Sequence, residues 1–223
     1  MFTLLLLAPM LLGAQLILTL VLLKGDICLG QRGRIHKVLP IIAILWGISA
    51  FTFYPEALVG IMLLYFFSQV KTKKTREQGP LWALWLAGGL ALLSVGYQVV
   101  MQEGIGRIAI IVMIPLLGSA FAHLLLTVAR TRLQAFHRIL PFTGIIAAML
   151  VAITILLHAY SLDETMRTEA TQLILAGMVL MLVAIAIWCW HIFTYKTANR
   201  MQLLIMLVLM LASATTTVAL FSL

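Results

Sequence analysis

Apolar runs of about 20 residues, separated by short polar connections, recur along the whole sequence. A run of this length is what a helix needs to cross a hydrocarbon core of roughly 30 Å. Hydrophobic residues make up 63% of the chain and charged residues 10%, whereas soluble domains are about half apolar. We therefore predict an all-α, polytopic integral membrane helix bundle of about eight transmembrane helices, with no soluble domain. The expected spans cover residues 2–23, 38–54, 56–70, 80–101, 108–129, 139–160, 170–195 and 201–223.

The apolar stretch from residue 38 to residue 70 is long enough to be a single helix, but we expect two short spans. Pro55 lies inside it, and proline removes a backbone donor and clashes with the preceding turn. One continuous helix would also place the basic cluster that begins at Lys71 on the opposite side of the membrane from the first basic loop. Two antiparallel helices keep both clusters on one side.

Basic residues are concentrated in the connections after the first, third, fifth and seventh expected spans, and only Arg107 and Arg167 lie in the others. Lys and Arg are enriched in the cytoplasmic loops of membrane proteins. We therefore expect both termini to face outward (N-out/C-out) and the basic loops to face the cytoplasm across a plasma membrane of the bacterial inner-membrane type. The same pattern explains the net charge of +8 without a nucleic-acid partner.

Short matches between the two parts of the chain predict an internal repeat. LLGAQLILTLVLLK resembles LLGSAFAHLLLTVA, IHKVLP resembles FHRILP, and FFSQVKT resembles HIFTYKT. These matches pair Gly13 with Gly118, His36 with His137, and Phe66 with His191. Four crossings return a chain to its starting side, so we expect two parallel four-helix halves, residues 1–104 and 105–223, in one membrane domain. The alternative is that transitions from a basic loop to a span resemble one another in any membrane protein.

Histidine is the ionisable residue that we expect inside the spans, because no Asp, Glu, Lys or Arg lies well within one. That pattern weighs against a carboxylate-based proton- or sodium-coupled transporter. His123 lies about 10 Å along its helix from Arg130, and His191 lies about 8 Å from Lys196. Two histidines at one depth on facing helices are the ligands of a six-coordinate haem b. Trp188 and Trp190 would then pack against the porphyrin in the bundle core.

Other interpretations of the same residues stay open. A buried histidine often makes an interhelical hydrogen bond worth about 1 kcal/mol and has no other role. A divalent metal held by His123, His137 and His191 is a further alternative, weakened by the lack of a carboxylate or of HxxxH spacing. Thr215 and Thr216, together with Gln172, could instead line a polar path for a solute, or serve only in helix packing.

Two four-helix halves with membrane histidines are similar in outline to haem A synthase and other polytopic b-type cytochromes. The similarity covers architecture only, and the first half lacks a deep histidine, which leaves room for one haem at most. Three hypotheses result: a haem b-binding or quinol-linked redox subunit, a permease- or channel-like transporter, and a non-catalytic subunit or assembly factor of a membrane complex. The expected partners are the lipid bilayer and, for the first and third hypotheses, quinol or other membrane subunits.

Overall fold

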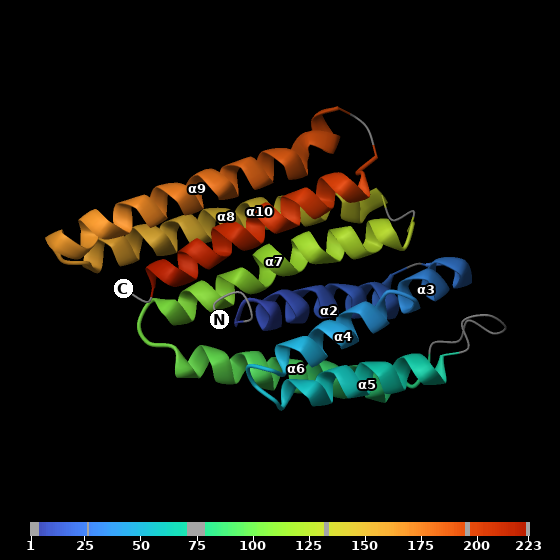
Figure 1. The fold of residues 1–223 in the computed structure, drawn as a ribbon. Helices are drawn as coiled ribbons and strands as arrows, with labels where there is room; N and C mark the ends of the chain where they lie inside the picture. Colours follow the sequence, from blue (N-terminus) through green and yellow to red (C-terminus); the bar gives the residue numbers. More distant parts are fainter. Residues whose placement is uncertain (1–4, 26, 71–78, 132–133, 195–196, 222–223) are drawn as a thin grey trace.

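The computed structural model describes residues 5–25, 27–70, 79–131, 134–194 and 197–221, and these residues form one helical bundle (Figure 1). The helices run roughly along a common axis, alternating in direction. Those of the first half are α2 (Leu7–Lys24), α3 (Leu29–His36), α4 (Leu39–Ser49), α5 (Glu56–Gln69) and α6 (Leu81–Met101). Those of the second half are α7 (Gly106–Val128), α8 (Gln134–Ser161), α9 (Glu164–Phe193) and α10 (Arg200–Leu220).

Six of the described helices (α2, α6, α7, α8, α9 and α10) are long and apolar enough to cross a membrane. This confirms a multi-pass, all-helical membrane protein. The helices α4 and α5 contain 11 and 14 residues, which correspond to about 17 and 21 Å at 1.5 Å per residue. Both are shorter than the hydrocarbon core, so the count of eight spans stays a prediction.

The expected break between the second and third spans is present, but it is wider than the sequence indicated. We placed the end of the second span at residue 54, whereas α4 ends at Ser49 and α5 begins after Pro55. The Thr52 side chain donates to the Ser49 carbonyl oxygen (2.6 Å), and such a local bond offers the backbone an alternative to the helix. The connection of residues 50–55 therefore begins one and a half turns before the proline.

The helices α2 and α7 form a central pair, with the other helices of the first half on one side and those of the second half on the other (Figure 1). These helices touch at two glycines that the sequence matches had paired: a β-carbon added at Gly118 would lie 2.5 Å from the Gly13 Cα. Small residues let membrane helices approach this closely, and packing rather than the hydrophobic effect then holds them together. The internal repeat itself stays a prediction.

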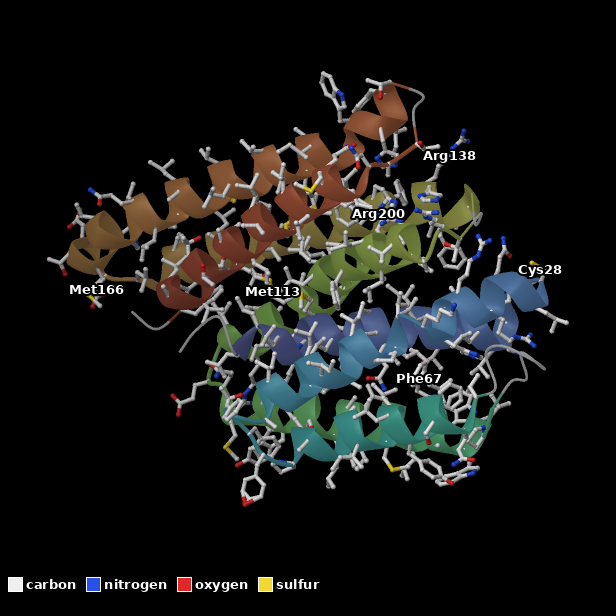
Figure 2. All side chains as sticks on the ribbon, turned by 45° about the vertical axis from the view of Figure 1, so that its right-hand side comes forward. Cys28, Phe67, Met113, Arg138, Met166 and Arg200 are labelled. Carbon is white, nitrogen blue, oxygen red and sulfur yellow. The ribbon has the colours of Figure 1, made fainter. Side chains whose placement is uncertain are left out.

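Basic residues from both halves lie at one end of the bundle. The Arg34 guanidinium donates to the Arg130 carbonyl oxygen at 2.9 Å, across 96 positions of sequence. Figure 2 shows Arg138 and Arg200 at this end, which we call the basic end, and Met166 at the other. The basic cluster of residues 71–76 lies outside the described residues. Which membrane face the basic end occupies stays a prediction.

Burial follows the pattern expected of a bundle in lipid. Leu11, Leu117 and Met206 are fully buried between helices, whereas Leu156 and Phe193 lie on the outer surface. Apolar side chains on the outside cost nothing against hydrocarbon, and helices satisfy their own backbone hydrogen bonds there. The outer surface thus fits a lipid environment.

Candidate functional site

A cluster of four polar aromatic side chains occupies the second half, near its basic end. The Trp188 indole N–H donates to His123 Nδ1 at 2.8 Å, and His123 Nε2 lies 2.9 Å from His137 Nδ1. His191 adds a third imidazole, whose ring centroid is 5.4 Å from that of His123. Residues from α7, α8 and α9 therefore meet at one point, which we call the histidine cluster.

The helix sequences make room for this cluster. Gly144 on α8 faces the Trp188 indole, and a β-carbon there would lie 2.5 Å from the ring atom Cη2. His123 is surrounded by buried neighbours on α7, including Ala122 and Leu124. The indole can therefore enter the helix interface and reach a ring nitrogen that has no access to water.

The hydrogen bonds fix which ring nitrogens carry protons. An indole N–H is only a donor, so His123 Nδ1 must accept, and a neutral His123 then carries its proton on Nε2. That proton points to His137 Nδ1, so a neutral His137 carries its own proton on Nε2. Trp188, His123 and His137 thus form a directed chain in which each member donates to the next.

His191 meets two backbone carbonyl oxygens. Its Nδ1 lies 2.7 Å from the Trp188 carbonyl oxygen, and its Nε2 lies 3.2 Å from the His137 carbonyl oxygen. A neutral imidazole can donate to only one of these, whereas an imidazolium can donate to both. The His191 ring therefore lies between a backbone acceptor of its own helix, α9, and one of α8.

A cavity of about 760 Å³ opens at the basic end beside the histidine cluster. Its described lining comes from the ends of α7 and α9, the following connection and the start of α10: Thr127, Arg130, Trp190, His191, Thr194, Thr197, Ala198, Asn199, Arg200 and Gln202. We call it the basic pocket. The described lining carries two guanidinium groups and an imidazole but no carboxylate, which favours an anionic ligand.

One detail of the basic pocket is unexplained by the fold alone. The Thr127 hydroxyl is buried and has no hydrogen-bond partner, and an unpaired buried hydroxyl is costly. The left-handed φ of 51° at Arg130, in contrast, belongs to the end of α7: the Arg130 N–H donates to the Thr127 carbonyl oxygen and the Thr131 N–H to the Leu126 carbonyl oxygen, which is a common helix C-terminal cap.

The structure separates the other residues that we had expected to act together. Trp188 is fully buried in the histidine cluster, whereas Trp190 is 63% exposed on the opposite side of α9 and lines the basic pocket. The hydroxyls of Thr215 and Thr216 bond back to carbonyl oxygens of their own helix. Gln172 is exposed on the outer surface. These last three residues do not line a common path.

The histidine cluster does not fit a haem in this arrangement. Axial ligation needs a free ring nitrogen on each side of the iron, but both nitrogens of His123 are engaged and its side chain is 0% exposed. Among the residues with described side chains, no group of three His, Cys, Asp or Glu is placed to hold a metal ion. The prediction that His123 and His191 lie together in the second half agrees with the geometry, whereas their assignment as haem ligands remains a hypothesis.

Sequence reasoning missed a buried carboxyl group in the first half. Glu56, the first residue of α5, is 0% exposed, and its Oε1 accepts a hydrogen bond from Gln98 Nε2 at 3.0 Å. We had treated Glu56 as a residue at the boundary of a span. The available signal was a lone acidic residue after Pro55 in a break between two short apolar runs.

His36 is buried as well: it is 1% exposed and packs edge-on against Phe66, with ring centroids 5.6 Å apart. It ends α3, outside the six long helices. Burial, with a smaller effect of the Arg32 charge, lowers the pKa of His36 to about 4. His36 is therefore a neutral, buried residue of the first half.

Comparison with known proteins supplies the family. The chain matches an integral membrane domain family over residues 3–219. It belongs to that family. A relative from Haemophilus influenzae strain Rd, named "Uncharacterized protein", is 31% identical over 207 residues, which cover 86% of this chain and 77% of the relative. No solved structure matches the chain. The family thus supports an integral, multi-pass membrane protein. The kind of ligand has to be inferred from the geometry of the site.

Proposed function

We propose that the protein is a permease-like protein of the bacterial inner membrane that binds an anionic solute in the basic pocket, with the basic end facing the cytoplasm. The observation that carries this proposal is the pocket's charge: Arg130, Arg200 and His191 converge on one open cavity whose described lining holds no carboxylate. The excess of Lys and Arg in the same loops supports the cytoplasmic orientation.

The pocket has the donors that an oxyanion needs. Guanidinium groups bind phosphate and carboxylate through paired N–H donors, and Arg130 and Arg200 both line the pocket. The first turn of α10 also lies at the pocket, through Arg200 and Gln202. A helix N-terminus favours a bound anion because of its free N–H groups and dipole.

His191 links ligand binding to the histidine cluster. It lines the basic pocket, and its ring lies 5.4 Å from the ring of His123. His191 therefore connects the basic pocket to the histidine cluster.

Binding of inorganic phosphate to the purified protein in nanodiscs of zwitterionic lipid tests this proposal. We expect saturable binding that Arg200→Gln weakens about tenfold, since one lost charge-assisted contact is worth about 1.4 kcal/mol. The matched control is Arg107→Gln, which neutralises an exposed arginine at the start of α7, the opposite end of the bundle. It should leave binding unchanged.

A second experiment shows whether the bound anion is a solute or a lipid headgroup. Doping the nanodiscs with phosphatidylglycerol should leave phosphate affinity unchanged if the ligand is a solute, and should reduce it if a lipid headgroup fills the pocket. Proteoliposomes loaded with phosphate should then show flux that Arg200→Gln slows. Absence of binding, or equal binding by both arginine variants, would refute the anion site.

The redox hypothesis is the second candidate, because the structure brings His123 and His191 within 5.4 Å, ring to ring. Ligation of haem b would require His123 to give up one of its two hydrogen bonds. An absorption spectrum of the detergent-purified protein, with metal analysis of the same sample, distinguishes this hypothesis. A haem band that His123→Ala removes would replace the permease proposal, and stoichiometric co-purification with other membrane proteins would favour a subunit or assembly factor.

A further inference from the structure

A second polar cluster lies in the first half, at the end of the bundle opposite the basic end. Figure 1 shows the connection between α4 and α5 at this end, next to the last turns of α6. Glu56 begins α5, Gln98 belongs to the final turn of α6, and Ser49 ends α4. Glu56 and Ser49 are 0% exposed, and Gln98 is 8% exposed.

Three buried oxygen atoms of this cluster have no hydrogen-bond partner: Glu56 Oε2, Gln98 Oε1 and Ser49 Oγ. The bond from Gln98 Nε2 to Glu56 Oε1 satisfies only one of the two carboxyl oxygens. The Ser49 hydroxyl interacts with the same carboxyl, although not in hydrogen-bond geometry. Apart from the Ser49 hydroxyl, which can donate as well as accept, the unpaired atoms are acceptors, so the cluster has more acceptors than donors.

Among the described residues, no positive charge offsets the carboxyl group of Glu56. The helices packed against α5 are α4 and α6, and neither contains Asp, Glu, Lys, Arg or His; Tyr97 on α6 is their only titratable side chain. Among the described residues, no Lys or Arg forms a salt bridge with Glu56. The nearest charged residues along the chain from Gln98 are Glu103, which is exposed, and Arg107, whose side chain donates to the Gln102 carbonyl oxygen.

An ionised carboxylate in these surroundings would be an uncompensated buried charge. Such a charge costs far more than a neutral buried group, and it is normally removed by taking up a proton. The N-terminus of α5 favours negative charge by about 1 kcal/mol only. A proton on Oε2 removes the charge and also adds an O–H donor, which can bond to the Ser49 or Gln98 oxygen.

A metal ion explains the cluster less well than a proton. Hard cations take about six oxygen ligands, and the cluster offers three unpaired side-chain oxygens. The carbonyl oxygens of the adjoining turn are already used: Ser49 accepts from the Thr52 N–H, and Phe53 accepts from the Glu56 N–H. One proton needs only one new hydrogen bond.

We propose that Glu56, with Gln98 and Ser49, forms a proton-binding site in the membrane-embedded first half, in which the carboxyl group carries an exchangeable proton. The site is independent of the basic pocket, since it lies in the other half and at the other end of the bundle. The short helices α4 and α5, separated by the Pro55 connection, are the elements that would admit water to it.

Infrared spectroscopy of the purified protein in nanodiscs at neutral pH tests this inference. We expect a carbonyl stretch of a protonated carboxylic acid, shifted to lower frequency after transfer to D₂O. Glu56→Gln should abolish the band, because the amide keeps the size and hydrogen-bonding groups of the side chain but has no carboxyl group. The matched control, Glu103→Gln, removes an exposed carboxylate just beyond the end of α6 and should leave the band intact.

A second variant keeps the test decisive if Glu56→Gln fails to fold. Gln98→Leu removes the donor to Oε1, so the band should persist and move to higher frequency. The inference is overturned if wild-type protein lacks the band at neutral pH, if the band survives Glu56→Gln, or if it appears only when Na⁺ is removed. The last result would assign the site to a metal cation.

Discussion

The two halves of the molecule contain equivalent hydrogen bonds between helices, but the acceptor side chains differ. In each half an indole from an outer helix donates to a buried acceptor on the central helix: Trp46 to Gln15 Oε1 at 2.9 Å, and Trp188 to His123 Nδ1 at 2.8 Å. In the first half the acceptor is an amide that does not titrate. In the second half it is an imidazole connected to two others.

The positions that the sequence matches pair show the same contrast. His36 packs against Phe66 in the first half, whereas its counterpart His137 bonds to His123 and contributes a carbonyl oxygen to His191. An apolar partner makes His36 a structural residue, and imidazole partners make His137 part of a site. The comparison teaches that the neighbours of a membrane histidine, and not its position in the chain, decide its role.

The contact between the halves gives the largest expected effect. Gly118→Val would place side-chain atoms within the Gly13 backbone, and overpacking of this kind costs about 3 kcal/mol or more where the backbone itself must move. We expect a large loss of thermal stability in detergent, measured by fluorescence-detected size-exclusion chromatography. Gly89→Val, at a glycine with open space around it, should change stability little, and equal losses in both variants would contradict the contact.

His36 gives the next largest effect, through pH. A histidine in an unfolded chain has a pKa of about 6.5, and that of His36 in the folded protein is about 4. The unfolded state therefore binds the proton first, so this contribution to stability is complete above pH 6.5 and is lost as pH falls toward 4. The loss is at most about 3 kcal/mol.

The measurement is the free energy of unfolding across this pH range for wild-type protein and for His36→Phe. The variant keeps an aromatic ring against Phe66 but cannot titrate, so its stability should depend less on pH. Parallel curves for the two proteins would show that His36 is not buried as a neutral residue.

Trp188→Phe should give a smaller effect. It leaves His123 Nδ1 buried without a donor, which costs about 2 kcal/mol. Trp46→Phe tests the equivalent bond in the first half and should cost a similar amount, but only Trp188→Phe should also alter the imidazole NMR signals of His137. Trp190→Phe, at an exposed position of the same helix, is the control and should have almost no effect on the melting temperature.

Sequence patterns were sufficient for the membrane class and for the position of most helix ends, and they placed His123 and His191 at a similar depth in the second half. They were insufficient where a side chain's surroundings depend on another helix. Trp190 and Trp188 are two residues apart, and nothing in the local sequence shows which of them enters the core. Glu56 was placed at a span boundary because burial at a helix start depends on whether Gln98 of α6 lies beside it.

The sequence by itself determined that this chain crosses a membrane repeatedly, because hydrocarbon admits only long apolar segments whose backbone groups are paired within the helix. Only the tertiary structure decided which polar side chains meet. Inside the bundle a polar group needs a partner, and the partners of His123, Glu56 and Gln15 lie on other helices, from 14 to 65 positions away in the chain. Their chemistry therefore depends on how the helices pack, which local patterns do not encode.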